Sequence, residues 1–267
     1  LSTLGLMMLI SSAELISIVI SLEISSYSLY AIVPLRKGQT RIQLEASFKY
    51  LFFGAISSGI MIFGMSYIYG IAHSTFLVDI IPALVQFLDK PIGILAIVLT
   101  LTGFFFKLSL FPFHFWAPDI YEGASNNTTT FIATIPKIAA AALLIRISTL
   151  ALPGPVQLVN IMMVLAAFSM TIGNLVGLVQ KDIKRLLAYS GIAHAGYLML
   201  GILSMNKEGF ASSMFYITIY LFMNLACFYV IVLISKKGEN VKIEDLAGLS
   251  KRSPLLALLM TVGAFSL

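Results

Sequence analysis

The feature of this sequence that most constrains its fold is a series of apolar runs, each long enough to cross a lipid bilayer. A bilayer core of about 30 Å needs about 20 apolar residues in an α-helix, since each residue adds about 1.5 Å. Seven full runs of this kind lie at residues 15–34, 44–70, 92–117, 127–150, 156–179, 186–203 and 209–235. Two partial runs lie at 1–11 and 254–267. The pattern predicts an all-α, polytopic transmembrane helix bundle.

Composition excludes the soluble alternatives. Hydrophobic residues make up 59% of the 267-residue chain, charged residues make up 11%, and the mean hydropathy is +0.96. These values exclude a disordered chain, a coiled coil and a nucleic-acid-binding domain, and the single cysteine, Cys227, excludes a disulfide scaffold. The mixed stretch at 71–90, with Asp79, Pro82 and Asp89, predicts a loop with one short interfacial helix.

We expect one membrane domain over residues 1–267. The sequence begins at Leu1 and ends at Leu267, both inside apolar runs, with neither an initiator Met nor a signal peptide. These features predict a fragment of a longer chain.

The positive charges are concentrated on one side of the predicted bundle. Twelve of the 17 Lys and Arg residues lie at 36–49, 180–185 and 236–252. If the runs alternate in direction, these segments share one side with 118–126, and the other side has only Lys90 and Lys207. The positive-inside rule makes the basic side cytoplasmic, so the net charge of +5 reports orientation and indicates no nucleic-acid partner.

Three basic residues, Lys107, Lys137 and Arg146, fall inside the runs. A charge at the bilayer centre costs about 3 kcal/mol, so each such residue needs an explanation. Arg146 lies near the outer end of its run, where its side chain is expected to snorkel to the interface. Lys137 lies near the midplane, and Glu23 and Lys107 lie at related depths. The sequence therefore predicts a row of ionisable groups in the membrane.

Two interpretations of this row remain open. In the structural one, Glu23 and Lys107 form a buried ion pair that fixes helix register, and backbone carbonyls satisfy Lys137. In the functional one, these three residues relay protons, because burial and a nearby carboxylate change the proton affinity of a lysine in opposite directions. His194, about ten residues into its run, is a fourth candidate, although an isolated histidine is often only a packing residue.

Prolines lie beside both lysines of the row. Pro112 is five residues after Lys107, and Pro136 directly precedes Lys137. Since proline removes a backbone donor, we expect both helices to open there and to line a cavity. The sequence has no CxxC, HExxH, GxSxG or P-loop motif, so we expect neither a metal nor a redox cofactor in this chain.

Several segments resemble a known family. They include FKLSLFPFHFWAPDIYEG at 106–123, PKIAAAALLIR at 136–146 and GNLVGLVQKDIKRLLAYSGIAHAGYLMLG at 173–201. These segments resemble the antiporter-like subunits of respiratory complex I, and Lys137 with EASFKY at 45–50 is most like the N-subunit branch of the bacterial complex. The resemblance implies a fold of about fourteen transmembrane helices with inverted repeats and a broken helix. This chain would span about helices four to twelve.

The resemblance also implies roles for individual residues. Glu23 matches the glutamate of the fifth helix, Lys107 matches the lysine of the broken seventh helix that pairs with it, and Lys137 matches the central lysine of the eighth. The ionisable residue of the family's broken twelfth helix is expected beyond Leu267.

The function implied by the resemblance is that of a proton-translocating subunit of NADH-quinone oxidoreductase, in a bacterial or archaeal cytoplasmic membrane. Its partners would be other membrane subunits, the lipid bilayer, protons and water. No redox chemistry is expected in this chain, and NADH, FMN, iron-sulfur clusters and quinone are expected in other subunits.

Three alternatives remain open. The first is a subunit of an Mrp-type cation/proton antiporter. The second is the equivalent subunit of a membrane-bound hydrogenase or of another quinone-reducing dehydrogenase. The third is a structural spacer whose charges only hold helices together.

Overall fold

Helices form along every apolar run of the sequence. The computed structural model describes residues 1–36, 40–88, 90–150, 156–235 and 238–266. Its elements are α1 (Ser2–Ser11), α2 (Leu15–Ile32), η1 (Val33–Leu35), α3 (Thr40–Ala72), α4 (Leu77–Val85), α5 (Pro91–Leu108), α6 (Trp116–Gly123), α7 (Asn126–Leu150), α8 (Val156–Gly177), α9 (Ile183–Leu203), α10 (Lys207–Ile234), η2 (Ile243–Leu246), α11 (Leu249–Arg252) and α12 (Pro254–Ser266).

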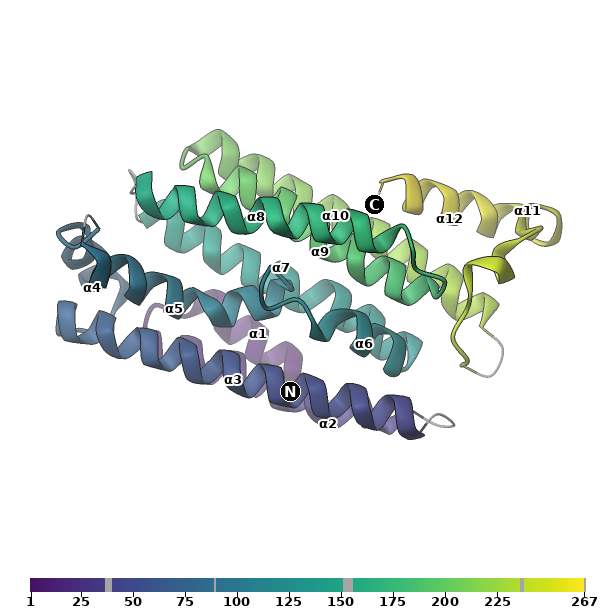
Figure 1. Ribbon diagram of the computed structural model, residues 1–267, viewed down its shortest axis with the longest axis horizontal. Coiled ribbons are helices and arrows are strands. Elements are labelled where there is room, and N and C mark those ends of the chain that lie inside the picture. The colour runs from purple at the N-terminus through teal and green to yellow at the C-terminus, as the bar shows by residue number, and fades with distance from the viewer. Residues whose placement is uncertain (37–39, 89, 151–155, 236–237, 267) are drawn as a thin grey trace.

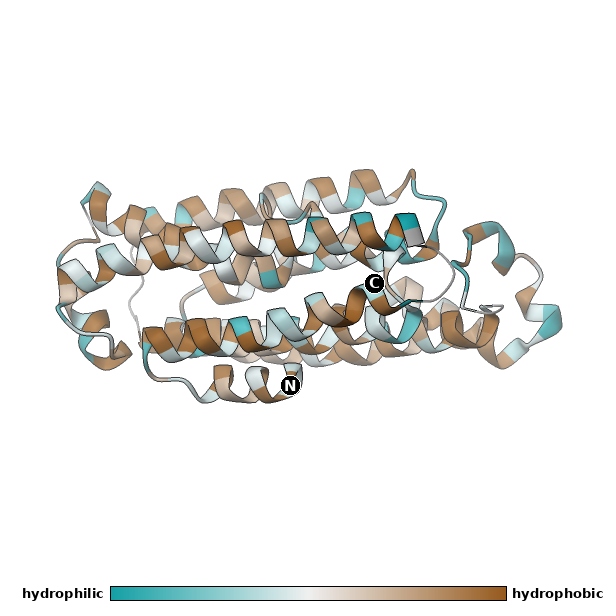
Figure 2. Ribbon diagram, turned by 90° about the horizontal axis from the view of Figure 1, so that it is seen from below, coloured by the Kyte–Doolittle hydropathy of each residue, from teal (hydrophilic) through white to brown (hydrophobic). Residues whose placement is uncertain are grey.

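The long helices lie side by side along the long axis of the molecule (Figure 1). Within the described residues, seven helices are long and apolar enough to cross a membrane, and α1 and α12 are shorter apolar helices. Hydrophobic residues cover the lengths of the helices, and hydrophilic residues gather mainly in the end segments (Figure 2). The prediction of seven full spans and two partial ones is confirmed, and the chain is an integral membrane protein.

The span predicted at 92–117 is wrong as one helix. Helix α5 ends at Leu108, because Ser109 adopts a left-handed conformation with a φ of 60° and its N–H caps the helix by bonding to the Phe105 and Phe106 carbonyls. Pro112 lies in the non-helical stretch between α5 and α6. The expected helix break beside Lys107 is therefore confirmed.

The expected break at Pro136 is wrong. Helix α7 continues from Asn126 to Leu150 with Pro136 inside it. Neighbouring helices α1, α5, α9 and α10 pack around α7, and a transmembrane helix supported in this way tolerates a proline without unwinding.

The predicted clustering of basic segments is also confirmed. The end of α2, the start of α3, α6, the start of α9 and the segment after α10 lie at one end of the bundle (Figure 1). We call this the basic end. Lys90 and Lys207 lie at the starts of α5 and α10, at the opposite end. Lys37, Asp89, Lys236, Lys237 and Leu267 lie outside the described residues.

The short helix predicted between residues 71 and 90 is α4, at the end of the bundle opposite the basic end. Backbone hydrogen bonds attach its entry to the α1–α2 turn, from Leu15 to Thr75 and from Leu77 to Ala13, each 2.9 Å long. Arg146, expected to snorkel, donates from Nη1 to the Ile10 carbonyl at the end of α1. A cation at a helix C-terminus is favoured by the helix dipole.

Candidate functional site

Lys137 lies near the middle of α7 and is 2% exposed. Its Nζ donates to the Gly191 carbonyl of α9 at 3.2 Å and to the Tyr220 hydroxyl of α10 at 3.3 Å. The ring centroids of Tyr121 and Tyr220 lie 6.0 and 5.6 Å from this nitrogen, within reach of a cation–π interaction. Among the described residues, no carboxylate forms an ion pair with Lys137, so only neutral groups hold this buried amine.

Gly191 permits the close approach of α9 to Lys137. A Cβ atom at this position would lie 2.7 Å from Lys137 Nζ and 2.8 Å from the Tyr220 hydroxyl. Both distances are shorter than normal van der Waals contacts. Any side chain at residue 191 would therefore displace the lysine or the tyrosine.

Lys107 lies in the last turn of α5 and is 4% exposed. Its Nζ is buried and has no hydrogen-bond partner in the part of the chain that the structure describes. The helix ends one residue later, and the negative end of its dipole favours a cation there. Lys107 is thus a buried amine with a favourable local field and no direct partner.

Glu23 does not contact Lys107 directly. It lies half-buried on α2 and accepts a hydrogen bond from the Ser58 hydroxyl of α3. Over the described ranges no ion pair joins Glu23 to Lys107, although Glu23 is the carboxylate that acts on Lys107 electrostatically. The two groups are therefore near each other but separate in this structure.

His194 lies on α9 and its side chain is buried. Its Nδ1 shares a hydrogen bond with the Tyr216 hydroxyl, and the rings of three tyrosines surround it at 5.4–5.9 Å, namely Tyr197, Tyr216 and Tyr220. A cavity of about 10 Å³ lies between Lys137 and His194. This volume is about that needed for one water molecule.

Two of the four predicted site residues line the same small cavity. Lys137 and His194 line it directly, and so does Leu108, which follows Lys107 in the chain. The structure thus brings Lys137 and His194 together at one cavity, with Lys107 one residue from its wall. Glu23 is not among the described residues that line this cavity.

Sequence reasoning did not select two tyrosines of this site. The Tyr121 hydroxyl is buried without a hydrogen-bond partner among the described residues, and Tyr216 pairs with His194. No spacing rule marks either residue. Of the polar residues in the runs, Asn224 donates to the Tyr220 carbonyl and Asn174 to the Tyr197 hydroxyl.

Helix α9 begins at Ile183, three residues before the run predicted at 186–203. Asp182 caps α9 by accepting hydrogen bonds from the Lys184 and Arg185 N–H groups, so the helix begins at Ile183. This start places Lys184 in the first turn, where it is fully buried and donates from Nζ to the Ala124 carbonyl at 2.9 Å.

An ion-pair network joins three helices at the basic end. Asp119 of α6 pairs with Lys49 of α3 at 2.7 Å and with Arg185 of α9 at 2.8 Å, and Arg185 also pairs with Glu122. Burial alone would raise the pKa of Asp119, but the hydrogen bonds from Lys49 and Arg185 outweigh it and hold that pKa below its ordinary value. The network therefore fixes α6, beyond the helix break, against α3 and α9.

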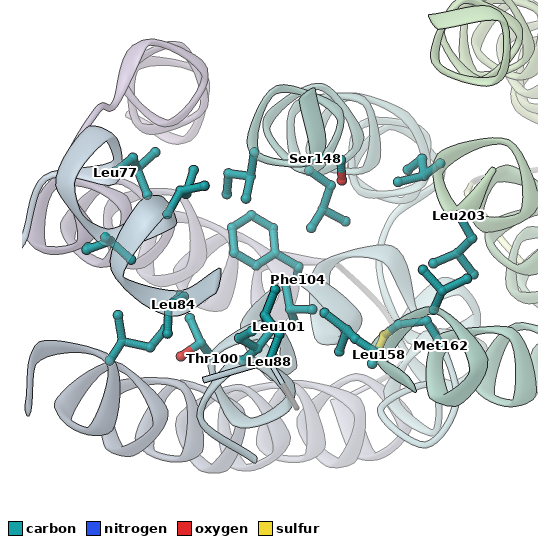
Figure 3. A pocket seen from close by; sticks show the side chains of 18 of the residues that line it. Leu77, Leu84, Leu88, Thr100, Leu101, Phe104, Ser148, Leu158, Met162 and Leu203 are labelled. Carbon is teal, nitrogen blue, oxygen red and sulfur yellow. The ribbon is translucent and has the colours of Figure 1, made fainter. Parts of the chain in front are cut away.

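An apolar cavity of about 160 Å³ lies toward the other end of the bundle (Figure 3). Its lining includes Leu77 and Leu84 of α4, Phe104 of α5 and Met162 of α8, and none of the described residues that line it has an ionisable side chain. A cavity lined in this way stays dry. It offers no route for a charged group, so the candidate site lies at Lys137.

Comparisons with known proteins identify the family of this chain. The family model described as "NADH:quinone oxidoreductase/Mrp antiporter, TM" matches residues 12–267. The chain is 49% identical over its whole length to NADH-quinone oxidoreductase subunit N 2 of Opitutus terrae, and this match covers 56% of the relative. The chain thus spans about half the length of the curated relatives it matches.

Solved structures show the same fold. A chain of respiratory complex I from Thermus thermophilus with bound aureothin is 37% identical and has a TM-score of 0.83, over 96% of this chain and 55% of that one. A chain of the Mrp complex from Dietzia sp. is 21% identical with a TM-score of 0.88, over 99% of this chain and 49% of that one, and shows likeness of fold alone. On the match of its family model, the chain belongs to the NADH:quinone oxidoreductase/Mrp antiporter transmembrane family.

Proposed function

We propose that this chain is the proton-translocating part of an N-type membrane subunit of NADH-quinone oxidoreductase. Protons would pass through Glu23, Lys107, Lys137 and His194, with NADH oxidation and quinone reduction in other subunits of the complex. The similarity to NADH-quinone oxidoreductase subunit N at 49% identity supports this choice within the family. The observation that best supports a proton relay is the set of neutral groups around the buried Lys137 amine.

A proton carrier must exist in two protonation states of similar free energy. An ammonium buried without any partner would be far too costly, and one paired with a carboxylate would hold its proton too tightly. Lys137 lies between these limits, because a carbonyl, a hydroxyl and two aromatic rings stabilise its charge while no carboxylate of the described residues binds it. Its environment suits both states.

The separation of Glu23 from Lys107 suggests how protons are driven. With Glu23 bonded to Ser58, the Lys107 ammonium has no direct partner and is disposed to release its proton. If Glu23 leaves Ser58 and approaches Lys107, the ion pair favours proton uptake. A charge change in a neighbouring subunit would switch Glu23 between these two positions.

The energy of a Glu23–Lys107 ion pair is comparable to the energy needed to move a proton against a membrane potential. A carboxylate 4 Å from an ammonium gains about 4 kcal/mol at an effective dielectric constant of about 20. Moving one charge against 100 mV costs about 2.3 kcal/mol. Forming or breaking the Glu23–Lys107 pair would therefore change the free energy by an amount comparable to the cost of moving one proton against about 100 mV.

After a transfer from Lys107 to Lys137, the next step takes the proton from Lys137 to His194. The small cavity beside Leu108 has room for about one water between Lys137 and His194. A water there would pass a proton between the amine and the imidazole, and the Tyr216 hydroxyl on His194 Nδ1 orients the ring for this exchange.

Lys107→Ala tests the relay. The assembled complex, reconstituted in liposomes, should oxidise NADH but acidify the lumen less than wild type does. Lys207→Ala removes an exposed lysine at the opposite end of the bundle and should pump normally. Equal pumping by the two variants would refute the relay and favour a structural spacer.

The subunit content of the purified complex tests the branch of the family. NADH- and quinone-module subunits should copurify with this chain. Copurification with cation-antiporter subunits alone would overturn the assignment to NADH-quinone oxidoreductase.

A further inference from the structure

A polar cavity of about 360 Å³ opens at the basic end, apart from the relay residues. Its lining comes from three separate segments: the end of η1 with Arg36, the start of α7 with Ser125, Asn126 and Asn127, and the end of α10 with Ser235. None of these residues belongs to the proposed proton path. The cavity lies where α7 begins and α10 ends.

Arg36 supplies a positive charge to this cavity. It is 7% exposed, and its guanidinium donates to backbone carbonyls, including those of Glu122 at 2.7 Å and Gly238 at 2.8 Å. Within the described segments no carboxylate forms an ion pair with it. Lys184 donates to the Ala124 carbonyl that Arg36 also contacts, so two buried cations meet here, and Asp182 and Glu122 are the carboxylates that act on both.

The start of α7 adds donors for an anion. The side chain of Asn126 is 7% exposed and makes no hydrogen bond to the described residues, so its Nδ2 is free to donate. Ser125 accepts a hydrogen bond from the Thr128 N–H, while the N–H groups of Asn126 and Asn127, at the positive end of the α7 dipole, donate none in the described part of the chain. An amide side chain, two free N–H groups and a guanidinium suit a phosphate group.

An apolar groove continues from this cavity toward the membrane interior. The groove has a volume of about 620 Å³ and shares Asn127 and Val232 with the polar cavity. Tyr229 and Leu225 of α10 line one wall, and Leu259 of α12, which packs beside α10, lines the other (Figure 1). From Val232 to Leu225 the helix descends about 10 Å into the membrane, since each residue adds about 1.5 Å.

We propose that the cavity and the groove together bind one anionic phospholipid. Its phosphate would lie against Arg36, Asn126 and the α7 N-terminus, and an acyl chain would follow the groove along α10. A free anion would use only the polar part, and a protein helix would use only the apolar part. A phospholipid matches both parts and the direction in which they are joined.

Photocrosslinking to the purified complex that contains the full-length protein tests this proposal. The probe is phosphatidylglycerol with a diazirine on one acyl chain, added below saturation to the complex in detergent. Peptide mass spectrometry should find the label on α10 near Leu225 and Tyr229 or on α12 near Leu259. Unlabelled phosphatidylglycerol should compete more strongly than phosphatidylcholine, and inorganic phosphate should not displace the probe.

Two variants of Asn126 separate recognition from folding. The Asn126 side chain makes no hydrogen bond to the described residues, so Asn126→Ala should assemble normally and reduce labelling about tenfold, as expected for one lost hydrogen bond to a charged group. Asn126→Asp should reduce labelling further, because it places a carboxylate against the phosphate. Asn160→Ala, at an exposed asparagine of α8, is the matched control and should label like wild type.

Leu225→Trp examines the groove separately, since the larger side chain should exclude the acyl chain and abolish labelling of α10. Unchanged labelling in both Asn126 variants would overturn the headgroup site. Complete displacement of the probe by inorganic phosphate would indicate a free-anion site, and absence of label from α10 and α12 would indicate that protein covers the groove. Both outcomes would contradict a phospholipid.

Discussion

Gly191→Ala tests whether the setting of Lys137 matters for proton transfer. In most helices this substitution is mildly stabilising, because alanine has a helix propensity about 1 kcal/mol better than that of glycine. At residue 191 the new Cβ would lie 2.7 Å from Lys137 Nζ and 2.8 Å from the Tyr220 hydroxyl. The lysine amine and the tyrosine hydroxyl are the flexible ends of their side chains, so they must move.

The size of the effect follows from the bonds that are lost. Lys137 Nζ has two hydrogen bonds, of 3.2 and 3.3 Å, and the added methyl group separates it from at least one partner. A hydrogen bond to a charged group contributes about 1.5–3 kcal/mol. Loss of one bond therefore lowers the population of protonated Lys137 roughly 10- to 150-fold relative to the neutral form, at a fixed pH.

The assay is the number of protons pumped per NADH oxidised, in liposomes that contain the assembled complex. Gly59→Ala is the control, since its Cβ would meet nothing within 4 Å and the helix-propensity gain is the same. We expect Gly59→Ala to pump normally and Gly191→Ala to pump much less while NADH oxidation continues. Equal ratios in the two variants would refute the role assigned to the carbonyl and hydroxyl around Lys137.

Two further predictions concern the carboxylates. Glu23→Gln should impair pumping more than Glu14→Gln, because Glu14 lies at the α1–α2 turn and accepts a hydrogen bond from Thr75; equal effects on the pumping ratio would mean that Glu23 is the wrong carboxylate. Asp119→Asn should lower the stability of the subunit by about 1–2 kcal/mol through loss of two ion pairs, measured as its thermal midpoint in detergent. The pKa of Asp119 is held below its ordinary value, so its contribution is complete above about pH 5 and is lost as the pH falls through the folded-state pKa. Wild type should therefore lose more stability than Asp119→Asn between about pH 5 and pH 3, and parallel losses would contradict this.

Much of the fold was predictable because lipid removes the usual ambiguity of sequence reading. Every spanning segment must form its backbone hydrogen bonds within itself, so length and hydropathy identify the helices. The basic residues between the segments then indicate the direction of each helix. The sequence was a poorer guide to where individual helices end, because local backbone geometry determines this. Ser109 ends α5 by a left-handed conformation that the sequence does not mark, while Pro136 looks like a helix break but lies inside a continuous helix.

The candidate site was predictable in its charges and not in its neutral partners. Lys107, Lys137 and Glu23 are conspicuous because charge is rare in membrane spans. The groups that hold Lys137 are a glycine carbonyl and a tyrosine hydroxyl, which are common in such helices and carry no pattern. Lys184 was not predictable as a buried charge, because it lies in a basic segment of the sequence. It is fully buried because Asp182 caps α9 and places Lys184 in the first turn of that helix.

Lys137→Ala tests directly whether Lys137 carries protons through the membrane. The measurement is the ratio of protons pumped to NADH oxidised in the assembled, liposome-reconstituted complex, with subunit content verified on the same preparation. We expect a ratio clearly below that of wild type, at an NADH oxidation rate sufficient to measure it. A ratio equal to that of wild type in the assembled variant would contradict this role of Lys137.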